Sequence, residues 1–306
     1  MTEPDISPVP VSRRFAQVCG LLLCGISLLT VMAWTSGWLF IAQWGVKYVP
    51  IAPSTALAIA VLGAGLFAGS RWPTHRRARR FTACAAALGS GLAVLVLVQC
   101  FGGFRLEWER FLVNAPESFE GISVGRMSPV TAITVLLAGL ALLASVTASA
   151  AWRTGPSLGA SLATFVTVTS SVVILGYAYR MPLLYGGTVI PVALPTALAL
   201  LLLGLGLLAA GDRHVWPTRM LLGPSIRARL LRAFLPVTLA LFVCEDWLQL
   251  AFFPDYVANP VVWSSLAALG TLAIMGGVVM LIARGIGNSL QTAEQAAGSV
   301  PLIVKS

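Results

Sequence analysis

Four polar side chains lie in or beside long apolar stretches, and their types suit them to bind a ligand or an ion. Glu245 and Asp246 interrupt the stretch 232–252, about 20 Å from its start at 1.5 Å per residue, and Gln99 and Arg180 lie near the outer ends of two others. Ionisable groups at membrane depth commonly mark binding sites or proton paths. A ligand site or an ion pair built from these four side chains is therefore geometrically possible. The competing interpretation is that both acids reach the outer interface or simply pair with Arg180.

The residues that most catalytic and metal sites need are missing from the apolar stretches. The two histidines, His75 and His214, lie between stretches in basic segments. This placement excludes haem ligation by two histidines and an HExxH zinc site within the membrane. No GxxxxGK[ST] loop and no glycine-rich dinucleotide fingerprint is present, and no hydrophilic segment exceeds about 25 residues, too few for a catalytic domain. The sequence predicts a chain that is not an enzyme and has no metal or cofactor.

The composition sets the environment in which these side chains must be positioned. Of 306 residues, 58% are hydrophobic and 10% charged, with a mean hydropathy of +0.88, whereas soluble proteins have about 45–50% and 25%. So few charges could not cover a soluble protein of this size, and this excludes secreted, disordered and nucleic-acid-binding proteins. Apolar stretches long enough to cross a bilayer predict an all-α integral membrane protein of eight transmembrane helices. They are 17–41, 53–70, 81–103, 129–150, 156–178, 192–210, 232–252 and 260–283.

The distribution of lysine and arginine orients these helices. With both termini in the cytoplasm, fifteen of the twenty basic residues lie inside and five outside, as the positive-inside rule requires. The net charge of +9 is then a topology signal and a contact for anionic lipid heads. We expect a cytoplasmic tail at 1–16, an eight-helix domain at 17–283, and an exit helix and tail at 284–306.

A short motif is repeated at the start of every second stretch. Proline is followed by a Thr-Ala pair, and a glycine follows each threonine by eight positions. The three copies are Pro53, Thr55 and Gly63; Pro129, Thr131 and Gly139; and Pro195, Thr196 and Gly204. Pro260 and Gly270 form a fainter fourth copy without the Thr-Ala pair. This periodicity predicts four helical hairpins, each crossing outward and returning inward.

The repeated residue types have physical reasons. Proline in a first helical turn leaves no N–H unsatisfied, and a nearby threonine hydroxyl can bond a free backbone group there. The alanine and the glycine lie seven residues apart and share a helix face, where small residues let helices approach closely in lipid. The plain interpretation is packing alone. In a sharper interpretation, three helix N-termini surround an outward-facing pocket and offer their dipoles to an anion.

Several segments resemble the multi-span N-terminal sensor region of bacterial sensory proteins. They are the repeated helix starts, the sequence LLYGG at 183–187, ALPTA at 193–197 and RLLRAFLP at 229–236. In that family such regions precede PAS domains and a histidine kinase core, often hybrid, or a diguanylate cyclase. The resemblance covers nearly all of 15–297. It implies a homodimeric input module in a bacterial inner membrane that passes a stimulus through its last transmembrane helix to a downstream cytoplasmic domain. The family's catalytic residues match no position here.

Two other function classes remain open. A transporter of small solutes or protons would use Glu245 and Asp246 as carrier groups. Transporters often show inverted repeats and broken helices, however, whereas these repeats run parallel and no stretch is broken at its centre. A structural or assembly subunit would instead bind a membrane complex through its lipid-facing grooves.

Overall fold

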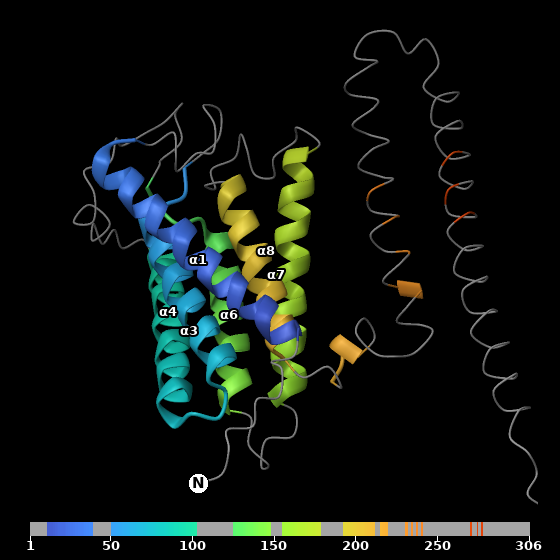
Figure 1. The fold of residues 1–306 in the computed structure, drawn as a ribbon. Helices are drawn as coiled ribbons and strands as arrows, with labels where there is room; N and C mark the ends of the chain where they lie inside the picture. Colours follow the sequence, from blue (N-terminus) through green and yellow to red (C-terminus); the bar gives the residue numbers. More distant parts are fainter. Residues whose placement is uncertain are drawn as a thin grey trace, which may run out of the picture. The chain divides into compact units, whose positions relative to one another are not determined.

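The computed structural model describes six helices. It covers residues 11–38, 50–102, 125–147, 155–178, 192–211 and 215–219, and the single positions 230, 231, 234, 237, 240, 270, 274 and 277. The helices are α1 (Val11–Ser36), α3 (Pro53–Arg71), α4 (Arg76–Gly102), α6 (Pro129–Thr147), α7 (Gly155–Ala178) and α8 (Leu194–Ala210) (Figure 1). The chain divides into two units, Met1–Arg219 and Met220–Ser306. All the described positions of the second unit are helical.

The six helices confirm a multi-pass, all-α membrane protein. Five helices are long and apolar enough to cross a bilayer: α1, α3, α4, α6 and α7. Helix α8 is also apolar but shorter than these five. Helices α1 and α4 begin five or six residues before the predicted stretches, because hydropathy marks only the apolar part of a helix. The seventh and eighth predicted stretches lie mostly outside the described residues. A count of eight therefore stays a prediction.

Consecutive helices of the first unit pair as hairpins. Helix α1 packs most extensively on α3, α4 on α6, and α7 on α8. Their antiparallel sense is clear from α1, where Gln17 donates a hydrogen bond to the carbonyl of Ser70 near the end of α3. At the other end of the pair, Trp34 bonds the carbonyl of Ile51, just before α3 begins. The hairpins predicted for the first six stretches are therefore present.

The hairpins are arranged so that their second helices lie inside. Each of α3, α6 and α8 contacts the other two, and each of α1, α4 and α7 packs against two members of this inner trio. Burial follows the same division. In an apolar stretch of 18 residues, 67% of the residues of α3 are buried, against 33% for α1 and 28% for α7. The helices that carry the repeated motif are therefore the inner ones.

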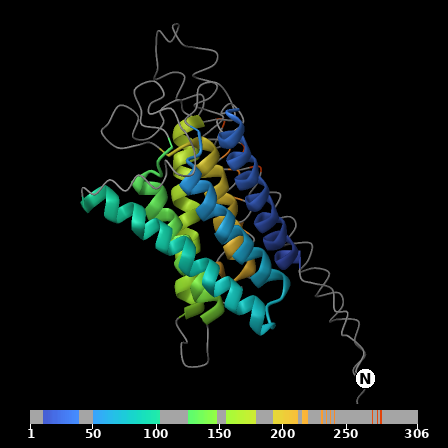
Figure 2. The same ribbon diagram turned by 90° about the vertical axis from the view of Figure 1, so that its left-hand side faces the viewer.

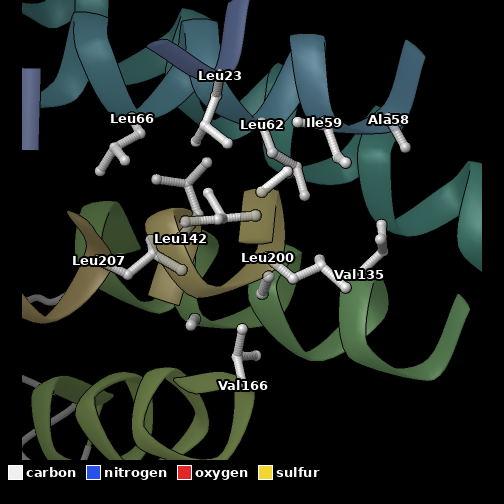
Figure 3. Packing of buried hydrophobic residues seen from close by; sticks show 14 of the residues in the cluster. Leu23, Ala58, Ile59, Leu62, Leu66, Val135, Leu142, Val166, Leu200 and Leu207 are labelled. Carbon is white, nitrogen blue, oxygen red and sulfur yellow. The ribbon is translucent and has the colours of Figure 1, made fainter. Parts of the chain in front are cut away.

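The core fills the space where the inner trio meets. Side chains from α1, α3, α6, α7 and α8 point toward one another there (Figure 3). The labelled members of this cluster are Leu23, Ala58, Ile59, Leu62, Leu66, Val135, Leu142, Val166, Leu200 and Leu207. Large apolar side chains also cover the outer faces, including Leu28 on α1, Leu88 on α4 and Phe165 on α7, all about half exposed or more. Such faces suit contact with lipid chains rather than water.

The two ends of the bundle differ in charge. Because the hairpins are antiparallel, the start of α1, the end of α3 and the start of α4 meet at one end. This arginine end carries Arg13, Arg14, Arg71, Arg76, Arg77, Arg79 and Arg80. At the other end, the helix-start end where α3, α6 and α8 begin, Arg126 is the sole charged residue in the part of the chain that the structure describes. None of the described residues is acidic.

Candidate functional site

The three repeated helix starts have the same backbone geometry. In each one the alanine of the Thr-Ala pair donates its backbone N–H to the carbonyl four residues earlier. These hydrogen bonds join Ala56 to Ala52 (2.9 Å), Ala132 to Ser128 (2.9 Å) and Ala197 to Ala193 (3.0 Å). The threonine is thus the third helical residue in every copy. Proline is the first helical residue in α3 and α6 but the second in α8, which explains why the proline-to-threonine spacing differs by one.

The repeated threonines are buried but do not act as N-caps. Thr55, Thr131 and Thr196 are only 2%, 2% and 3% exposed. In α6 the capping group is Ser128, whose hydroxyl accepts a hydrogen bond from the backbone N–H of Thr131 at 3.3 Å. Helices α3 and α8 begin after alanine and have no side-chain cap. The cap of α6 thus comes from the residue before the first helical residue, whose side chain reaches the free N–H groups, and not from the repeated threonine.

Within the described part of the chain, two polar groups at the helix-start end are buried without a hydrogen-bond partner. One is the hydroxyl of Ser54, which follows Pro53 in the first turn of α3 and is 1% exposed. The other is Nε2 of Gln99, in the last turn of α4. A buried polar group without a partner is uncommon in native proteins and calls for an explanation. The described residues hold three further buried hydroxyls of this kind, on Ser27, Ser70 and Thr218, so such groups are not confined to the helix-start end.

Aromatic side chains tie two outer helices to the residues that precede the inner ones. The indole N–H of Trp34 in α1 donates to the carbonyl of Ile51 at 2.7 Å. The hydroxyl of Tyr177 in α7 donates to the carbonyl of Val192, also at 2.7 Å. Ile51 and Val192 each lie two residues before their inner helix begins. We call these two contacts the aromatic ties. Neither tie can be predicted from the sequence, since the hydrogen bonds form only after the hairpin has closed.

The predicted ligand or ion-pair cluster is described at one position only. Gln99 lies at the helix-start end, half-buried, whereas Arg180, Glu245 and Asp246 lie outside the described residues. The association of these four side chains stays a prediction.

Each repeated glycine of the inner trio lies against the outer helix of its own hairpin. A Cβ added to Gly63 would be 2.8 Å from Cβ of Leu23 in α1, closer than side chains normally approach. A Cβ on Gly139 would be 3.1 Å from the carbonyl oxygen of Ala86 in α4, and one on Gly204 would be 3.1 Å from the backbone nitrogen of Thr167 in α7.

The fourth glycine of the repeat, Gly270, belongs to the second unit. It is helical and exposed, with no described atom within 4 Å of an added Cβ.

No protein-family model, no curated protein and no solved structure matches this chain. Its own residues show a multi-span helical membrane protein in which one hairpin, with a buried Thr-Ala helix start and a close glycine contact, occurs three times.

Proposed function

We propose that the chain is the membrane-embedded sensory input module of a bacterial signal-transduction protein of the histidine kinase type. In this proposal it lies in the inner membrane as a homodimer, with the arginine end in the cytoplasm, where the positive-inside rule favours basic residues. The helix-start end then faces outward. The module passes its signal through the predicted last span, 260–283, to a cytoplasmic output domain.

One observation carries the proposal: the starts of all three inner helices lie at the same end and are structurally equivalent. A stimulus that alters one helix start acts on a trio whose members contact one another, so its effect reaches the whole bundle. The aromatic ties add a link from those starts to the outer helices α1 and α7. Transmission requires two discrete arrangements of the helices, which the stimulus favours unequally.

The glycine contacts support such a rearrangement. Helices in lipid associate through close packing of small residues rather than through a hydrophobic driving force. Gly63, Gly139 and Gly204 each hold an inner helix against its outer partner in this way. A methyl group at one of these positions would shift one hairpin interface and would bias the bundle toward one arrangement.

The test is a chimera in which a histidine kinase core follows Ala297, assayed for autophosphorylation in membrane vesicles. Gly204→Ala is expected to change the rate severalfold, since its new Cβ would meet Thr167. The matched control is Gly91→Ala, where nothing lies within 4 Å of the added atom. Helix content from circular dichroism shows that both variants fold. Equal rates for the two folded variants and the parent chimera would contradict the proposal.

Transport is the main alternative, and it would depend on Glu245 and Asp246. The six described helices supply no further acidic residue for a carrier site. Proteoliposome uptake that is lost in Glu245→Gln and Asp246→Asn would establish transport and displace the sensory proposal. A structural role would instead be indicated by a partner that copurifies stoichiometrically from native membranes.

A further inference from the structure

A groove of about 530 Å³ opens between α1, α3 and α4 near the arginine end. Helix α3 packs against both α1 and α4 (Figure 2). Small residues of α3 and α4 form part of the groove, and larger apolar side chains surround them. The apolar residues that line the groove come from all three helices: Leu21 and Cys24 of α1, Ala64, Phe67 and Ala68 of α3, and Ala78 and Phe81 of α4. The volume falls within the range of about 300–1,000 Å³ that is usual for small-molecule sites.

The mouth of the groove is aromatic and basic. By its mouth we mean the end of the groove nearest the turn between α3 and α4. Trp72 and His75 of that turn line it, together with Arg77 in the first turn of α4. The ring of Trp72 meets Phe67 edge to face at 6.2 Å between centroids, and the guanidinium of Arg71 lies over it, 5.5 Å from its centroid. Tryptophan is enriched where a membrane protein passes from hydrocarbon to headgroups. Trp72 therefore places the mouth at headgroup depth.

The arginines near the mouth are not equivalent. Arg79 donates a hydrogen bond of 2.7 Å to the carbonyl of Val146, near the end of α6, so it is engaged in the bundle itself. Arg77 is exposed, lines the groove and has no hydrogen-bond partner in the described part of the chain, which also lacks acidic residues. A guanidinium of this kind presents paired N–H donors in the geometry that suits a phosphate.

We propose that this groove binds one anionic phospholipid, with an acyl chain along the apolar lining and the phosphate at Arg77. The apolar and basic parts of the lining are continuous, as an amphipathic occupant requires. Basic pockets between transmembrane helices are known to take anionic lipid heads. Positive charge with no acid among the described residues favours an anionic lipid over a zwitterionic one. The site lies at the opposite end from the helix starts and does not depend on the sensory proposal.

The experiment uses the full chain in phosphatidylcholine vesicles containing a small fraction of phosphatidylglycerol with a diazirine in one acyl chain. After illumination, peptide mass spectrometry locates the crosslinks. We expect them on the groove residues of α3 and α4 and expect Arg77→Gln to lower their yield about fivefold, the effect of one cation near a lipid surface. Arg80→Gln removes the same charge from the same helix but does not line the groove. It should leave the yield within twofold.

Competition distinguishes the sources of the phosphate group. Excess unlabelled phosphatidylglycerol should suppress the crosslinks, whereas phosphatidylcholine and soluble glycerol phosphate should not. Ala64→Trp fills the groove and should abolish the crosslinks without loss of helix content. Equal losses in Arg77→Gln and Arg80→Gln would show diffuse surface attraction and overturn the site. Competition by glycerol phosphate as strong as that by the lipid would overturn the choice of a lipid.

Discussion

Gly20 of α1 and Gly63 of α3 meet backbone to backbone at the centre of the first hairpin. A Cβ on Gly20 would lie 2.8 Å from the carbonyl oxygen of Gly63, and a Cβ on Gly63 would lie 3.2 Å from the carbonyl oxygen of Gly20. Neither helix can gain a methyl group here without moving away from the other. The contact is therefore reciprocal: both glycines are needed for the same close approach, which in lipid is a main source of helix association.

Gly63→Ala is expected to destabilise the bundle by about 1–3 kcal/mol, the usual cost of adding a group to a packed interface. Equilibrium unfolding of the purified chain in mixed detergent and SDS micelles, followed by circular dichroism, measures this change. Gly25→Ala in α1 is the control, since nothing lies within 4 Å of its added Cβ. If the two variants unfold at the same SDS fraction, the packing role of Gly63 is wrong.

The second hairpin allows a double-mutant test. A Cβ on Gly139 would collide with the hydroxyl of Ser90 in α4, so Gly139→Ala should destabilise the chain. Ser90→Ala removes that oxygen and should recover part of the loss, with a coupling energy of about 0.5–3 kcal/mol between the two positions. The same unfolding assay on the two single variants and the double variant gives the coupling. Additive effects would mean that Ser90 is not the group that Gly139 accommodates.

Loss of the hydrogen bond from Trp34 to Ile51, the aromatic tie of the first hairpin, is expected to lower the stability of the chain. Trp34→Phe keeps an aromatic ring but leaves the carbonyl of Ile51 without its buried donor, which costs about 1–3 kcal/mol. Trp38→Phe serves as the control, because this residue is 62% exposed and lies just beyond the same helix. Thermal unfolding in detergent should separate the two variants clearly; indistinguishable midpoints would argue against the tie.

Arg79 is expected to stabilise the end of α6. Its guanidinium donates to the carbonyl of Val146, one of the last four carbonyls, which lack a partner within the helix. The bond is exposed, so Arg79→Gln should cost only about 0.3–1 kcal/mol. Hydrogen exchange of the last turn of α6 should quicken in Arg79→Gln and stay unchanged in Arg80→Gln. Faster exchange in both would indicate a general charge effect instead of this contact.

The sequence alone determined where the first six helices lie, because each apolar stretch must satisfy its own backbone within the bilayer. It also revealed the repeat, since equivalent helix starts need the same residue types: Pro53, Pro129 and Pro195 all occupy a first turn. The sequence also predicted that basic residues gather at one end of the bundle, because the arginines lie in the segments that flank particular apolar stretches.

Only the tertiary structure decided which helices are inner and which groups meet. Hydropathy cannot distinguish α3 from α1, because a face buried on protein and a face buried in lipid are equally apolar. The partner of Gly63 is Gly20 rather than a residue of α4, and the carbonyl bonded by Trp34 belongs to Ile51. Such pairings depend on how two helices cross, and the close fit of small residues fixes that crossing once the hairpins have closed.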